Sequence, residues 1–168
     1  GQSSAFSSNI WGSTTETMGF AQSVAFGTSP TTSKQERNLS TPEVEDYLER
    51  FAKLAQTEMN KFGIPASIKM AQAILESSAG HSLAAKSDNN HFGALLAGQP
   101  YESAWRNWRE HSLLLINKYP HLQNLGNDYR AWARGLQKVA YNTSPNYANQ
   151  LLEIIDHFHL EQLDDPTI

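Results

Sequence analysis

The chain is 168 residues long, with 39% hydrophobic residues, no cysteine and a formal net charge of −4. This length suffices for one domain with a buried core. The absence of cysteine excludes disulfides and thiol-ligated metals. The acidic balance argues against nucleic acid as a partner, because phosphate binding needs an excess of Lys and Arg on one face. No run approaches the roughly 20 apolar residues of a membrane span, so no span is predicted.

Residues 1–40 form an irregular N-terminal extension that is rich in Ser and Thr and broken by Gly and Pro. It nevertheless holds more apolar bulk than a solvated linker needs: Phe6, Ile10, Trp11, Phe20, Val24 and Phe26. We expect the extension to pack on its own domain or on a neighbouring copy, so that self-association through residues 1–40 is one prediction. Because the chain begins at Gly1 instead of Met, we also expect the natural start, with any signal peptide, to be absent from this sequence.

From residue 41 onward the pattern is helical. Ser40, Pro42 and Glu43 are typical of a helix start, and apolar residues then recur at helical spacing up to Gly63. A second helix is predicted from Pro65 to Gly80, with Ile68, Ala71 and Leu75 on its buried face. Residues 81–86 allow one further turn, and residues 88–93 are typical of a polar loop.

Three more helices are predicted in the second half of the chain. One covers residues 102–118 with Trp105 and Trp108 directed inward, one covers residues 128–140, and the last begins after Pro145. No stretch after residue 40 shows the alternation of a strand. The sequence therefore predicts a mainly α domain over residues 41–168.

Glu76 is the residue best suited to catalysis. It lies in the segment AQAILESSAG, at the end of an otherwise apolar helix and directly after a core leucine. Burial against apolar neighbours raises the pKa of a carboxyl group, and a glycosidic general acid needs a raised pKa to hold its proton near neutral pH. The alternative is a glutamate of the last turn that points to water. Spacing alone does not decide between the two.

Two further segments suit sugar binding. Asn89, Asn90 and Phe92 combine paired amides with an aromatic face, although Asn and Gly also serve turns. Tyr141 and Tyr147 flank a helix start, where a phenol could orient a water molecule or an acetamido group. Half-buried packing is the commoner use of such tyrosines.

Signals for metals and cofactors are weak. Among the six histidines, His157 and His159 are two residues apart and would face different sides of a helix. No glycine-rich phosphate loop and no nucleophile elbow is present. The sequence thus predicts neither a metal site nor a cofactor.

Taken in order, these segments resemble the bacterial endo-β-N-acetylglucosaminidases of glycoside hydrolase family 73, from about Glu43 to Leu160. The matching stretches are residues 71–77, 89–93, 101–103, 111–112, 128–136 and 141–148. The resemblance implies a lysozyme-like fold and cleavage of peptidoglycan glycan strands at N-acetylglucosamine, in the cell envelope, either periplasmic or secreted. It implies that Glu76 is the general acid. It places Asn89, Asn90, Phe92, Tyr141 and Tyr147 at the substrate.

One departure from the family concerns the second catalytic group. The family usually carries a longer insertion after the Phe-Gly pair, which forms a small β lobe and often supplies a second acid. Here only residues 94–100 connect to the next helix, and they contain no Asp or Glu. Asp88, Glu102 and Asp128 are the remaining candidates for a second carboxylate; otherwise the 2-acetamido group of the substrate acts as nucleophile. Two alternatives stay open: a catalytically weak or inactive wall-binding or assembly module, and an enzyme like a lytic transglycosylase.

Overall fold

The computed structural model describes residues 39–165, and every regular element within this range is a helix. The α-helices are α3 (Thr41–Phe62), α4 (Ala66–Ser77), α5 (Leu83–Asp88), α6 (Ala104–Lys118), α7 (Tyr129–Lys138) and α8 (Tyr147–Phe158). Short 3₁₀ helices join them: η3 (Ala94–Leu96), η4 (Pro120–Leu125) and η5 (Leu160–Asp164). The prediction of a mainly α domain is confirmed. The predictions for the N-terminal extension fall, apart from its last two residues, outside the described range.

Local sequence accounts for the start and end of α3. Ser40 accepts a hydrogen bond from the Glu43 amide, and the Glu43 carboxylate accepts one from the Ser40 amide, which completes a capping box. Gly63 ends the helix in the left-handed conformation at φ 76°. Both ends lie where the sequence predicts them.

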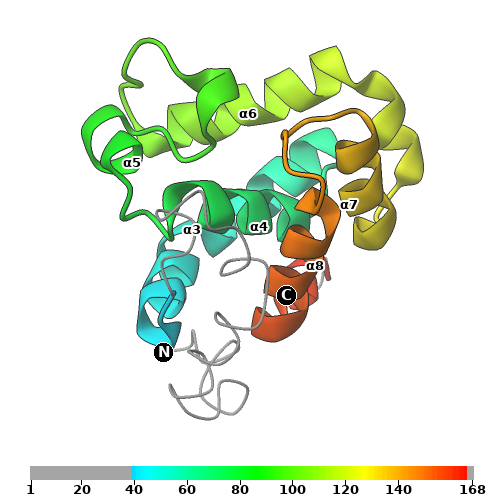
Figure 1. The fold of residues 1–168 in the computed structure, drawn as a ribbon, viewed down its shortest axis with the longest axis horizontal. Helices are drawn as coiled ribbons and strands as arrows, with labels where there is room; N and C mark the ends of the chain where they lie inside the picture. Colours follow the sequence, from blue (N-terminus) through cyan, green and yellow to red (C-terminus); the bar gives the residue numbers. More distant parts are fainter. Residues whose placement is uncertain (1–38, 166–168) are drawn as a thin grey trace.

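Helix α4 is the central element. Figure 1 shows it in the middle of the molecule, and α3, α7, α8 and η5 pack against it. The sequence predicts one buried face, yet nearly every side chain of α4 is buried, including those of Lys69 and Gln72. A helix that is covered on all sides places its polar groups in the interior, where each needs a partner.

The start of α4 is held by a residue far away in the chain. Pro65 precedes the helix and provides no side-chain cap. Asp164 of η5 supplies one instead: its carboxylate accepts hydrogen bonds from the Ser67 amide at 2.8 Å and from the Ser67 hydroxyl at 2.6 Å. Burial raises the pKa of Asp164 to about 6, while these hydrogen bonds act in the opposite direction. Asp164 therefore anchors the helix that carries Glu76 at its other end.

Several predicted helix limits differ from the structure. Helix α4 ends at Ser77, before Gly80, because Ser78 and Ala79 both take left-handed backbone conformations. Helix α6 starts at Ala104 because the Ser103 hydroxyl caps it. The prediction that Trp105 points inward is wrong, since its side chain is 47% exposed.

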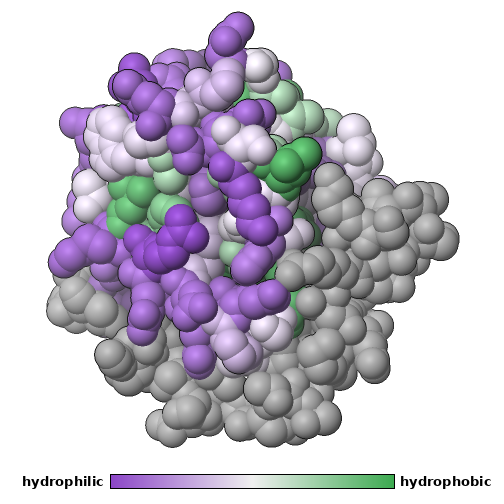
Figure 2. Space-filling view, turned by 90° about the vertical axis from the view of Figure 1, so that its left-hand side faces the viewer, coloured by the Kyte–Doolittle hydropathy of each residue, from purple (hydrophilic) through white to green (hydrophobic). Residues whose placement is uncertain are grey.

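One face of the described residues is mainly polar (Figure 2). Figure 2 shows hydrophilic residues over most of the visible face, with small, separate apolar patches. No helix within residues 39–165 is long and apolar enough to cross a lipid bilayer.

Candidate active site

Glu76 lies in the last turn of α4, where the buried helix reaches the surface, and its side chain is partly exposed. The side-chain amide of Asn142, from the connection between α7 and α8, donates a hydrogen bond of 3.0 Å to Glu76 Oε2. The other end of that amide is fixed as well, because Asn142 Oδ1 accepts the Ser144 amide at 2.8 Å. Asn142 thus holds the carboxyl group of Glu76 in one orientation.

Gly93 covers the other side of the Glu76 carboxyl group. A Cβ atom built on Gly93 would lie 2.6 Å from Glu76 Oε1 and 3.1 Å from Cδ, closer than real Cβ atoms approach other atoms. Gly93 also has φ 88° and ψ −157°, a combination that is almost confined to glycine. Two independent requirements, backbone conformation and space, therefore select glycine at this position.

The loop before Gly93 is held by its own amide side chains. Asn90 is buried; its Oδ1 accepts hydrogen bonds from the Phe92 amide at 3.0 Å and from the Asn107 amide group at 3.2 Å, and its Nδ2 donates to the Gly93 carbonyl at 3.0 Å. Asn89 takes a left-handed conformation at the end of α5 and donates to the Tyr101 carbonyl at 2.8 Å. Phe92 is 2% exposed. Both amide atoms of Asn90 and the Nδ2 atom of Asn89 therefore bond within the protein, and those of Asn90 shape the turn at Gly93.

Both predicted tyrosines are buried and lie close enough to Glu76 for its charge to act on them. Their rings stack at a centroid distance of 5.8 Å. Tyr147 is fully buried and accepts a hydrogen bond of 2.9 Å from Gln72. The Tyr141 hydroxyl has no hydrogen-bond partner among the described residues. Burial raises the pKa of both phenols, and the negative charge of Glu76 raises both further. Tyr141 therefore has a buried hydroxyl without a partner among the described residues, within range of the charge of Glu76.

The three candidates for a second carboxylate, Asp88, Glu102 and Asp128, lie in three different settings. Asp128 caps α7 by accepting the Ala131 amide at 3.0 Å. Glu102 is exposed and lines a surface groove beside Arg106. Asp88 is the last residue of α5, and its carbonyl accepts the Tyr101 amide. The structure thus gives Asp128 a structural use and places Glu102 on an open surface.

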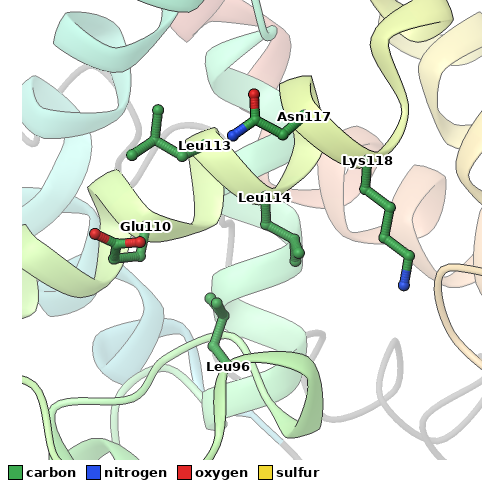
Figure 3. Close-up of a pocket in the computed structure, with 6 residues that line it drawn as sticks. All are labelled: Leu96, Glu110, Leu113, Leu114, Asn117 and Lys118. Atoms are coloured by element: carbon green, nitrogen blue, oxygen red, sulfur yellow. The ribbon is translucent and has the colours of Figure 1, made fainter.

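A shallow groove runs along α6 next to η3. Figure 3 shows Leu96 of η3 opposite Leu114 of α6, with Glu110 and Lys118 at the two ends. This part has a volume of about 370 Å³, and a neighbouring part of about 410 Å³ shares Leu96 and Glu110 with it. The groove begins three residues after the glycine that contacts Glu76.

Comparison with known proteins identifies the family. Residues 52–160 match the glucosaminidase family, described as mannosyl-glycoprotein endo-beta-N-acetylglucosaminidase. The chain belongs to this family of glycosidases. The resemblance drawn from the ordered sequence segments is thereby confirmed, and this glucosaminidase domain has the helical fold that the resemblance implied.

Individual relatives are similar to this glucosaminidase domain over most of its length. Exo-glucosaminidase LytG of Bacillus subtilis is 26% identical over 71% of the chain and 53% of its own length. An N-acetylmuramoyl-L-alanine amidase domain-containing protein of Staphylococcus aureus is 31% identical over 69% of the chain and 25% of its own length. The crystal structure of a Staphylococcus aureus N-acetylmuramoyl-L-alanine amidase superposes with a TM-score of 0.67 at 28% identity, covering 82% of this chain and 48% of that one. The chain spans about half, or less, of the length of these relatives.

Two residues at the site were not predicted from the sequence. Asn142 contacts an acid 66 positions earlier, which no local pattern indicates. Gly93 was predicted as the end of a loop, with no indication that it would lie against Glu76. The segments that contain both residues belong to the family resemblance, which was the only signal that pointed to them.

Proposed function

We propose that this domain hydrolyses the glycan strands of peptidoglycan at N-acetylglucosamine, as an endo-β-N-acetylglucosaminidase with Glu76 as the general acid. The observation that carries the proposal is the setting of Glu76. Its carboxyl group sits at the exposed end of a buried helix and is oriented by the Asn142 amide and the Gly93 backbone. A fixed acid at the edge of an apolar core is what proton delivery to a leaving oxygen requires.

The reaction follows from this geometry. The Glu76 carboxyl group gives its proton to the glycosidic oxygen while the bond from that oxygen to the anomeric carbon breaks through an oxocarbenium-like state. The oxygen leaves as a hydroxyl group of one product. Water then supplies a hydroxyl group to the anomeric carbon, and its remaining proton returns to the Glu76 carboxylate.

For the group that stabilises the anomeric carbon, we propose the 2-acetamido oxygen of the substrate. The settings of Asp88, Glu102 and Asp128 give no reason to prefer a second carboxylate. Substrate assistance needs a group that orients the acetamido function. We assign this role to Tyr141, whose buried hydroxyl has no partner among the described residues and would have to become accessible when substrate binds.

For the other predicted substrate-binding residues, we propose positioning roles. The Asn90 side chain bonds within its loop, and the Asn89 side chain donates to the Tyr101 carbonyl. Phe92 is buried beneath the loop, and Tyr147 is held by Gln72.

Cleavage within a strand is the part of the proposal that follows from the description of the matching family, an endo-beta-N-acetylglucosaminidase. Because peptidoglycan lies outside the cytoplasmic membrane, the proposal places the protein in the cell envelope, either periplasmic or secreted.

Digestion of purified peptidoglycan, with mass analysis of the products, tests the proposal. A glucosaminidase releases fragments with N-acetylglucosamine at the reducing end, a muramidase releases N-acetylmuramic acid there, and a lytic transglycosylase leaves an anhydro end. We expect the first result. Glu76→Gln should lower turnover by about 1,000-fold while the circular dichroism spectrum is retained, since a general acid contributes about 10²- to 10⁴-fold. Wild-type turnover in Glu76→Gln would sink the assignment of the acid.

A second candidate function is a wall-binding module with little or no turnover. The stretch between Gly93 and Ala104 favours it, because it contains a single 3₁₀ turn, η3, where the family usually has a lobe over the cleft. This candidate predicts that the protein sediments with insoluble peptidoglycan but releases no reducing ends, even at high protein concentration.

A further inference from the structure

A buried polar contact joins α4 to α6 behind the proposed active site. The Lys69 ammonium group and Nδ1 of His111 are 2.7 Å apart, and Lys69 also donates to the Trp108 carbonyl at 3.0 Å. Both side chains are fully buried. Burial lowers the pKa of both groups well below their usual values; the nearby Glu58 carboxylate acts in the opposite direction on Lys69, and Lys69 itself lowers the pKa of His111 further. A buried pair of this kind costs desolvation free energy, which two apolar side chains would not.

The contact fixes the plane of the His111 ring. That ring stacks on Phe92 with 3.8 Å between centroids and 6° between planes, and the Lys69 ammonium nitrogen lies 5.0 Å from the centre of the Phe92 ring. Phe92 directly precedes Gly93, whose backbone lies against Glu76. The same His111 ring meets Tyr141 edge-on at 6.1 Å. His111 therefore touches both the turn that covers the acid and the tyrosine beside it.

Lys69 belongs to the same helix as Glu76, seven residues earlier. Two turns of α-helix separate them, about 10.5 Å along the axis. The pair thus ties the helix that carries the acid to the turn and the tyrosine that surround it.

We propose that Lys69 and His111 are positioning residues, which hold the Phe92–Gly93 turn and Tyr141 at a fixed distance from Glu76. The directionality of a hydrogen bond explains why a polar pair occupies a place where an apolar pair would cost less. The catalytic consequence of this positioning rests on the proposed function, whereas the positioning itself does not.

Lys69→Met tests the pair, because methionine keeps the length of the side chain and removes its hydrogen bonds. We expect kcat on peptidoglycan to fall about 10- to 100-fold with KM changed less than about threefold, as for a small misplacement of reacting groups. Amide exchange gives a second readout: the Phe92 amide, which donates to Asn90, should exchange about tenfold faster or more. Phe158→Leu is the matched control, since it weakens the core at a fully buried position in α8.

The kcat and the Phe92 exchange rate of Lys69→Met and Phe158→Leu are compared for the same decrease in melting temperature. The proposal is overturned if Lys69→Met shows the same kcat and the same Phe92 exchange as Phe158→Leu. If the wild-type protein releases no reducing ends, the proposed function fails, and Phe92 exchange still decides the positioning.

Two substitutions of His111 separate the contribution of its polar atom from that of its ring. They serve as the test if Lys69→Met does not fold. His111→Asn keeps a polar group near the position of Nδ1 and loses the stacking ring, whereas His111→Phe keeps a ring and loses the polar atom. We expect both to accelerate Phe92 exchange. Wild-type kcat and exchange in His111→Phe would show that the polar contact is not needed, which refutes the proposal.

Discussion

Replacing Gly93 with alanine would disturb the proposed acid directly. The added Cβ atom would lie 2.6 Å from Glu76 Oε1, while ordinary contacts begin at 3.4 Å, so the carboxyl group or the turn must retreat by about 0.8 Å. A misplacement of about 1 Å costs on the order of 100-fold in rate, so we expect kcat/KM to fall between about 10- and 100-fold. The backbone conformation adds about 1–3 kcal/mol of lost stability.

Gly126→Ala separates the two effects. Gly126 has φ 64° and ψ −134°, similar to Gly93, but a Cβ atom there meets nothing within 4 Å. Release of reducing ends and denaturant unfolding, measured on both variants, should show similar losses of stability and a loss of activity for Gly93→Ala alone. If Gly93→Ala keeps its activity within about twofold of wild type, the contact with Glu76 has no role in turnover.

The remaining predictions concern stability. Arg109→Met should lower the free energy of unfolding by about 3–5 kcal/mol in a denaturant titration, because it removes the cation paired with the fully buried Glu58 carboxylate. Arg130→Ala breaks an exposed pair with Asp156 and should lower it by less than about 1 kcal/mol. Equal losses in the two variants would contradict this reasoning. Asp164 has a raised pKa of about 6 in the folded protein, so between about pH 4 and pH 6 the folded state binds more protons than the unfolded state. The contribution of Asp164 to the free energy of unfolding therefore falls by up to about 3 kcal/mol as the pH rises through that window. Asp164→Asn should remove that part of the slope, and an unchanged slope in unfolding experiments across the window would refute the assignment.

The sequence predicted the elements whose limits are set by neighbouring residues. The capping box at Ser40 and the glycine at residue 63 bound α3 as expected. Prediction from the sequence failed where contacts with distant residues decide which side chains are buried. Helical periodicity assigns α4 one buried face, but α3, α7, α8 and η5 all pack against it. Lys69 is buried as well, and its hydrogen-bond partners Trp108 and His111 come from α6. Trp105 was expected inward on apolarity alone, whereas its exposed ring lies against the Arg109 guanidinium group at 4.8 Å.

The residues of the candidate site also differ in whether neighbouring sequence could predict them. Glu76 could be singled out locally as a candidate, because an acid that ends an apolar helix is unusual. The choice between a catalytic and a water-facing glutamate rested on the ordered family segments. Its partner Asn142 could not, because it reaches Glu76 across 66 residues. The Asn90 side chain, which suggested sugar recognition, bonds within its own loop, and the Asn89 side chain donates to the Tyr101 carbonyl. Amides in a turn can support the backbone or bind a ligand. The hydrogen bonds show the first use, and sugar binding by Asn89 and Asn90 stays a prediction.

The hydrogen bonds between Ser67 and the Asp164 carboxylate limit where this domain can be truncated. The match to the family stops at residue 160, but the residue that seats the start of α4 comes four positions later, together with the buried Leu163. A fragment trimmed to the family boundary would expose the first turn of the helix that presents Glu76. Fusions, truncation series and domain grafts should therefore keep the chain at least through residue 165.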